Sequence, residues 1–442
     1  MKIKLILLFL VVMGMNCFAA DRYWVLGTGN WDAVTTTNWS TISGGLGGAS
    51  VPTSADNVIF DSLSNTLAYT VTITATANCA DFNMGAPLAG KVTWAGGSSL
   101  NIYGSINLLG GTTGITRTFN GVIKFLATTT GKTINTNGIT LVNPITFEGV
   151  GGAWTLLHNL NNNYSNISLT KGNLDFNDKD VNMGSMEFNN ANTRVLSLGN
   201  GTITINTSGS AAWTVITTTG LTFNAENSKI IIDNSGTTDA IFWSGGLTYY
   251  NLYVKSTGAN KTQIAGSAKF NDLNMNTGTT IKWTANTTTT LNDFKVIGTT
   301  HWATIQSATL GTRFNLKKIS GNIDGNHLDI RDSNAGGATN WYAGSDSNNG
   351  GNNLGWLWSD MPPAIDQCLC PVTGEWMIND GSNCTLSANC NLTNGGLNIV
   401  DGKLTILNTK TLTIPTTYKI ILKKSATNKI IIEKGGKIIK NK

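Results

Sequence analysis

The chain has 442 residues, of which only 12% are charged and 50 are glycine. Globular proteins carry about 25% charged residues and about 7% glycine, so this composition departs from the average in both respects. A hydrophobic share of 40% and a net charge of +5 exclude a disordered chain and a bundle of membrane helices. Thr, Ile, Val, Asn and Gly dominate, and these residues favour strands and turns, so we expect an all-β protein.

Residues 1–19 are predicted to form a secretory signal peptide. Two lysines within the first four residues precede eleven apolar residues, and Cys17-Phe18-Ala19 fits a small-x-small cleavage site. In an alternative interpretation Cys17 is a lipidated residue, which Asn16 disfavours because a lipobox has a small residue there. No later stretch is long and apolar enough to span a bilayer. We therefore expect a secreted or cell-surface protein with no transmembrane anchor.

Residues 20–62 are expected to cap the N-terminal end of the fold. Trp24, Trp31 and Trp39 are close in sequence and precede a predicted strand at residues 58–61. A stack of coils exposes an unpaired edge at its end, and large aromatic side chains can cover it. The alternative is an exposed aromatic platform that stacks on sugars, and we favour the cap.

Residues 63–358 contain short runs in which apolar and polar residues alternate, separated by Gly, Asn and Asp. Such runs occur at residues 69–74, 99–103, 173–176, 201–206, 229–233 and 326–331. Alternation is typical of strands with one face buried. The region is too long for one sandwich, and the similar segments that begin at Gly220 and Gly246 are 26 residues apart. We therefore predict a parallel β-helix, or β-solenoid.

Two segments carry a resemblance to a known group of proteins. The first contains RYWVLGTGNWD at 22–32, NWS at 38–40, VPTSAD at 51–56 and VIFD at 58–61; the second contains DIRDS at 329–333, WYAGS at 341–345 and GGNNLGW at 350–356. They resemble the opening and closing segments of secreted bacterial adhesin-like or autotransporter-adhesin-like β-helix proteins. The resemblance covers residues 22–358. It implies a β-helix, and it implies no particular activity, because most such proteins have none assigned.

Consecutive prolines at 362 and 363 predict a linker over residues 359–366. Residues 367–442 then form a small Cys-containing, Lys-rich β module, with alternating strands from residue 396 onward that suit further solenoid coils or a meander. Residues 403–442 contain ten Lys and one acid, Glu433. These lysines could bind an anionic envelope or host polysaccharide, or they could keep aggregation-prone Ile-rich edges soluble. We expect no nucleic-acid partner, because the chain is exported and lacks an aromatic-basic motif.

Four cysteines of this module, Cys368, Cys370, Cys384 and Cys390, are candidates for disulfides in an oxidising compartment. Four cysteines allow three connectivities, and our first choice is Cys384 with Cys390. A zinc site is the competing interpretation, but no histidine lies nearby. The remaining Cys79 is expected to be a buried apolar residue.

Two groups of acids are the weak candidates for chemistry. Period-two alternation places His327, Asp329 and Arg331 on one strand face, between Asp324 and Asp332, where they could form a catalytic acid–base site. The alternative, which we favour, is an outer strand face with a local Asp–Arg pair. The second group is Asp175, Asp178 and Asp180, which could bind calcium, although an Asp/Asn turn fits the spacing better.

These observations predict a secreted, non-enzymatic β-helix with a structural or adhesive role and no cofactor or metal. A polysaccharide lyase or glycosidase that uses His327, Asp329 and Arg331 is one alternative, because β-helix proteins include such enzymes. A carbohydrate-binding protein that uses exposed Trp is the other.

Overall fold

The computed structural model describes residues 19–441 except 86–87, 208–210, 235–237, 257–260, 319, 338, 362–367 and 380. Nearly all of the expected signal peptide and most of the expected linker lie outside these residues. The chain divides into two compact units, Met1–Met361 and Pro362–Lys442, here called unit one and unit two. The boundary falls within the segment 359–366.

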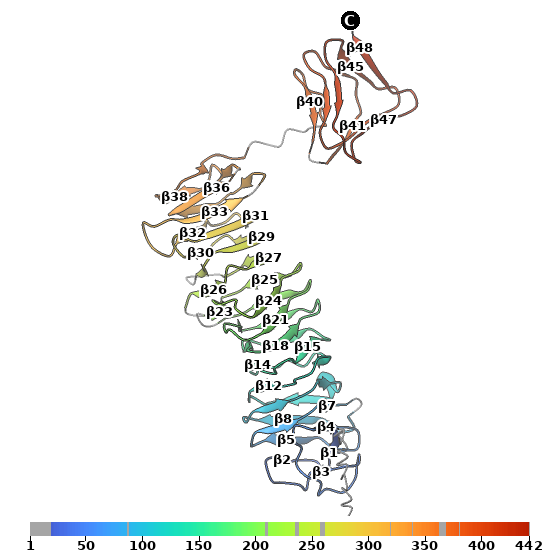
Figure 1. The fold of residues 1–442 in the computed structure, drawn as a ribbon, viewed down its shortest axis with the longest axis vertical. Helices are drawn as coiled ribbons and strands as arrows, with labels where there is room; N and C mark the ends of the chain where they lie inside the picture. Colours follow the sequence, from blue (N-terminus) through green and yellow to red (C-terminus); the bar gives the residue numbers. More distant parts are fainter. Residues whose placement is uncertain are drawn as a thin grey trace, which may run out of the picture. The chain divides into compact units, whose positions relative to one another are not determined.

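Unit one is a stack of coils whose strands form five sheets (Figure 1). Sheet A runs in the order β24 (Leu221–Asn224), β21 (Arg194–Ser197), β18 (Gly172–Asp175), β15 (Ala153–Leu156), β13 (Lys132–Asn135), β10 (Ile106–Leu108), β7 (Phe82–Met84), β4 (Asp56–Phe60), β1 (Ala20–Trp24) and β3 (Trp39–Ser40). Sheet B comprises β11 (Ile115–Arg117), β8 (Val92–Gly96), β5 (Tyr69–Ile73) and β2 (Gly29–Trp31). A single helical turn, α1 (Gly111–Gly114), precedes β11.

The other strands of unit one form three further sheets, and along the chain sheet D takes the place of sheet B between sheets A and C. Sheet C comprises β38 (Asn348–Asn349), β35 (Leu328–Arg331), β32 (Ala303–Ser307), β30 (Thr280–Trp283), β28 (Thr262–Ala265), β26 (Ala240–Ser244), β23 (Ala211–Val215), β20 (Ser185–Glu187), β17 (Asn166–Leu169), β14 (Ile145–Phe147), β12 (Ile123–Phe125), β9 (Leu100–Ile102) and β6 (Ala77–Cys79). Sheet D comprises β16 (Leu160–Asn161), β19 (Val181–Met183), β22 (Thr202–Ile205), β25 (Lys229–Ile232), β27 (Thr248–Val254), β29 (Ala268–Asn276), β31 (Thr288–Ile297), β33 (Phe314–Lys318) and β36 (Ser333–Gly337). Sheet E comprises β34 (Ile323–Asp324), β37 (Trp341–Tyr342) and β39 (Trp356–Leu357).

Unit two is a smaller solenoid with three sheets of three strands each. Their members are β40 (Trp376–Ile378), β43 (Leu397–Ile399) and β46 (Ile420–Leu422); β41 (Ser382–Leu386), β44 (Gly402–Ile406) and β47 (Lys429–Ile432); and β42 (Cys390–Asn391), β45 (Thr411–Pro415) and β48 (Lys437–Asn441). All six strand pairs are parallel. The module is therefore a solenoid and not a meander.

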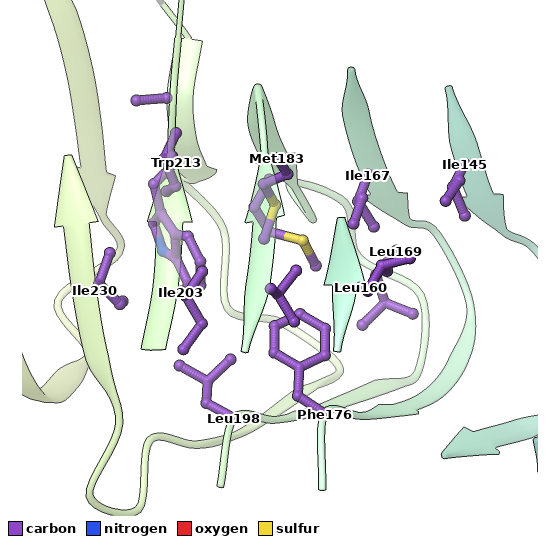
Figure 2. Close-up of a cluster of buried hydrophobic side chains, with 14 of the residues drawn as sticks. Ile145, Leu160, Ile167, Leu169, Phe176, Met183, Leu198, Ile203, Trp213 and Ile230 are labelled. Atoms are coloured by element: carbon purple, nitrogen blue, oxygen red, sulfur yellow. The ribbon is translucent and has the colours of Figure 1, made fainter. Parts of the chain in front are cut away.

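The interior of unit one is one apolar column. Leu100, Ile123, Ile145 and Ile167 occupy equivalent positions on successive strands of sheet C, and all four are buried. Figure 2 shows Ile145 and Ile167 pointing into the same interior as residues from other sides of the coils. Each coil alone could not bury its inward face, so stacking supplies most of the stabilisation. The prediction of an all-β parallel β-solenoid is confirmed.

The N-terminal end of this column is closed by tryptophans. Trp24, Trp31 and Trp39 are buried, and the Trp39 ring lies 5.0 Å from Trp24 and 5.1 Å from Trp31, between ring centroids. The Trp24 indole nitrogen donates a hydrogen bond to the Gly27 carbonyl at 2.7 Å. β1 pairs with β4 in parallel and with β3 antiparallel, so β3 covers the edge of the first coil. The three rings pack as a cap and present no stacking platform to solvent.

Candidate functional site

The predicted site at residues 324–332 is dispersed in the structure. β35 begins at Leu328, and Asp329 and Arg331 point outward from it while Leu328 and Ile330 are buried. His327 precedes the strand with a positive φ of 52°, so it lies outside β35, and the regular alternation of the strand covers only Leu328–Arg331.

The contacts of these residues link successive coils. The His327 Nδ1 atom lies 2.7 Å from an Asp346 carboxylate oxygen, and the Asn348 amide donates a hydrogen bond to Asp329 at 3.0 Å. Among the described residues Arg331 forms no ion pair with Asp324, Asp329 or Asp332, so the expected local Asp–Arg pair is wrong. Asp346 escaped the sequence analysis because it lies one coil away, 19 residues from His327. Its place in the coil repeat was the signal that could have found it.

The remaining two acids of this segment are separate from that group. Asp324 is exposed at the end of β34. Asp332 is buried, and its carboxylate accepts hydrogen bonds from the Gly311 backbone at 3.1 Å and the Asn352 amide at 2.6 Å. Asp332 therefore holds neighbouring turns together.

The second predicted group also stabilises turns. Asp175 accepts a hydrogen bond from the Asn177 backbone, and Asp178 accepts one from the Asn200 backbone, each at 2.8 Å. Asp180 accepts a third from the Thr202 backbone, also at 2.8 Å. Asp178 and Asp180 thereby connect one coil to the next. Within the described ranges no group of three or more His, Cys, Asp or Glu residues could hold a metal ion.

The cysteines of unit two form two disulfides, Cys368–Cys384 and Cys370–Cys390. The expected Cys384–Cys390 pair is wrong. Both residues are buried in the first coil, on β41 and β42, and each pairs with a cysteine of the segment that enters that coil. Cys79 in unit one is free and buried, as expected, and burial raises the pKa of its thiol.

The lysines of unit two gather on its last coil. Lys419, Lys423, Lys429 and Lys437 are exposed in or beside β46, β47 and β48. The one acid among residues 403–442, Glu433, accepts a hydrogen bond from the Asn408 backbone at 3.1 Å. The coil therefore has a basic surface.

A hollow of about 490 Å³ lies on unit one where sheet A ends at β24. In the coil of β24 a turn at residues 225–228 separates that strand from β25. In the following coils β27, β29 and β31 run across the equivalent corner without a turn. The turn at residues 225–228 therefore lies next to the longer strands β27, β29 and β31, and it forms one wall of the hollow.

Two outward-facing rows of side chains line this hollow. One row is Thr248, Lys269 and Thr290, which are register partners on β27, β29 and β31. The second row is Tyr250, Asn271 and Asn292, and the Asn292 amide donates to the Asn271 carbonyl oxygen at 3.4 Å. Sequence reasoning missed both rows, because their members are separated by whole coils.

Two carboxylates flank the hollow at the next position along the strands. Asp272 and Asp293 are register partners on β29 and β31, and Lys295 forms an ion pair with Asp293 at 2.9 Å. Burial raises the pKa of Asp272, and the Asp293 charge raises it further, while Lys295 and Lys318 act in the opposite direction.

This shift makes a prediction about pH. Because the folded state binds a proton at Asp272 more tightly than the unfolded state does, the carboxylate destabilises the fold at neutral pH. We expect Asp272→Asn to raise the free energy of unfolding at pH 7 by roughly a few tenths of a kcal/mol, since solvent screens the charges. The gain should vanish as the pH falls below about 4, where the carboxyl is protonated in both states. Denaturation curves over that range measure it, with Asp329→Asn as control; an unchanged gain at low pH would contradict the assignment.

No family model, curated protein or solved structure matches this chain. Among the described residues, no helix has the length and apolarity needed to cross a membrane. The fold and the geometry of its surfaces are therefore the basis for the functional argument.

Proposed function

We propose that the protein is an exported, non-enzymatic β-helix of the cell surface or extracellular matrix, with a structural or adhesive role. The observation that carries this proposal is the regular polar exterior of unit one. Outward amides bond from coil to coil, as in Asn78 with Asn101 and Asn83 with Asn107, each at 3.0 Å. A surface that presents similar donors and acceptors on neighbouring coils suits many weak contacts in parallel.

The acids discussed above support the same interpretation. Asp178, Asp180 and Asp332 all accept backbone hydrogen bonds that hold turns in place. Carboxylates used in this way stabilise the coils, and they are poorly placed for general acid–base work on a substrate. The proposal therefore assigns these acids to the scaffold.

The basic coil of unit two supports an anionic polysaccharide of the cell envelope or of a host as the partner. Exposed lysines such as Lys423 and Lys429 stand on a surface whose one acid is engaged in a turn. Attraction of this kind acts over a Debye length of about 8–10 Å and weakens as salt increases. The lysines can also keep the Ile-rich edge strands soluble, and the two roles are compatible.

Fractionation of cells that produce the chain naturally tests this proposal. We expect the protein in the envelope or extracellular fraction, accessible to protease on intact cells, and released from envelope by a high-salt wash. A cytosolic enzyme serves as the lysis control. Recovery of the protein only from the cytosol would refute the proposal.

A further inference from the structure

The hollow beside β24 is the place where the regular coil pattern of unit one changes. Glu226, in the turn at residues 225–228, has a positive φ of 49°, and the turn has no counterpart on β27, β29 or β31. Beneath this change the interior is continuous, since the Phe223 and Tyr249 rings lie 5.1 Å apart. The hollow therefore lies on the surface, above a continuous core. Three strands form most of its lining, and the turn at residues 225–228 forms the rest.

The chemistry of the lining is amphipathic. Tyr250 offers a half-buried aromatic ring and Thr248 offers a hydroxyl. The amides bond along their row, from Asn292 to Asn271 at 3.4 Å and from Asn271 to Asn251 at 3.3 Å, and each amide has a second N–H and a second lone pair for a ligand. Glu226 and Lys269 contribute one charge of each sign. A sugar ring has a matching character, with an apolar C–H face for the aromatic ring and hydroxyls for the amides.

The arrangement of the lining side chains also indicates the direction in which an extended ligand would lie. Both rows run from coil to coil, so equivalent side chains recur at the strand spacing of about 4.8 Å. A chain of sugar residues laid along the rows would meet one side chain of each row at every coil. The lining therefore suits a linear saccharide better than a single compact ligand.

Two other ligand classes fit less well. β29, the central strand of the hollow, is paired with β27 on one edge and with β31 on the other, so it offers no free edge for an added peptide strand. A polyanion would gain no net attraction, because Glu226, Asp272 and Asp293 at the hollow are balanced by Lys269, Lys295 and Lys318.

We propose that this hollow, lined by Glu226, Thr248, Tyr250, Lys269, Asn271 and Asn292, binds a neutral oligosaccharide segment that lies across successive coils. The inference rests on the proposed adhesive role and gives it a ligand and a binding site. Tyr250 packs against sugar rings, and the asparagine row bonds their hydroxyls. The basic coil of unit two is a separate surface for anionic polymers.

Affinity electrophoresis of the purified full chain tests the proposal. Native gels would contain one polysaccharide each: laminarin, xyloglucan or galactomannan as neutral probes, and polygalacturonate or alginate as acidic probes. We expect at least one neutral probe to retard the protein, with retardation that persists in high salt. Tyr250→Ala should weaken that binding roughly tenfold, equivalent to about 1.4 kcal/mol.

A second variant and two controls separate loss of the site from loss of the fold. Thr248 is exposed, so Thr248→Trp should fill the hollow without disturbing the interior and should also abolish retardation. Tyr103→Ala and Thr130→Trp alter exposed positions elsewhere on unit one and should bind as the parent does. Retardation by acidic probes alone, by no neutral probe, or equally for the hollow variants and the parent would overturn the proposal. The cellular location stays open to its own test in each of these cases.

Discussion

Replacing Arg194 with methionine should lower the free energy of unfolding of unit one by about 4 kcal/mol. The Arg194 side chain is fully buried at the start of β21, and its guanidinium donates to four backbone carbonyls. Phe188 and Asn192 accept at 2.9 Å within its own coil, and Thr219 and Thr217 accept at 2.9 and 3.1 Å in the next. A methionine fills much of the volume and leaves all four acceptors without this donor. Each buried acceptor left unsatisfied costs about 1–3 kcal/mol, partly relieved where water enters.

Chemical denaturation measures the loss, and hydrogen exchange locates it in peptides that cover residues 188–194 and 217–219. Arg331→Met is the matched control, since Arg331 is an exposed arginine of the same unit; it should change stability by less than about 0.5 kcal/mol. Arg194→Lys should fall between the two, because an ammonium retains the charge with fewer, differently placed donors. Equal stability of Arg194→Met and the parent would contradict the role given to this side chain.

Reduction of the two disulfides should unfold unit two while unit one remains folded. The bridges close sequence separations of 16 and 20 residues. Loops of this length contribute about 3 kcal/mol each, so losing both removes about 6 kcal/mol. Among the described residues of unit two, twelve buried side chains form the core, and the inward-facing Leu422 and Ile432 of its last coil remain exposed. A core of this size provides only a small free energy of unfolding, so unit two should unfold when both disulfides are lost.

Hydrogen exchange with and without a reductant measures the effect in each unit. Cys368→Ala with Cys370→Ala should reproduce it, because this double variant removes both bridges and leaves the buried Cys384 and Cys390 in place. Cys79→Ala, in unit one, serves as the control for loss of a cysteine outside the bridges. A peptide map of the oxidised protein should link 368 to 384 and 370 to 390. Linkage of 384 to 390, or full protection of unit two after reduction, would contradict the assignment.

The positions of the strands could largely be predicted from the sequence, because the alternation of apolar and polar residues involves only residues that are close in the chain. The run at residues 229–233 forms β25 at Lys229–Ile232, and the run at 201–206 forms β22 at Thr202–Ile205. The repeat between Gly220 and Gly246 marks equivalent positions in successive coils, where Phe223 and Tyr249 now meet. Their strands lie in different sheets, which the repeat could not indicate, because the turn that separates β24 from β25 is absent from β27.

The candidate sites were much less predictable, because their members come from different coils. His327 meets Asp346, and Asp272 meets Asp293, through the stacking of strands and not through sequence proximity. The disulfides depend on where the entering segment crosses the first coil of unit two, so spacing alone suggested the wrong partner for Cys384.

Three properties of this chain could be inferred before its fold was known: it is built from short alternating strands, tryptophans close its first coil, and lysines concentrate near residue 442. Each of these follows from side-chain type and short-range spacing. The contacts between side chains of different coils became known from the three-dimensional fold: the disulfide pairs, the four carbonyl groups around Arg194 and the hollow beside β24. These contacts depend on the length of each coil, which varies along the stack. One added or missing turn changes which residues of successive coils lie side by side, although the alternation of apolar and polar residues within each strand stays the same.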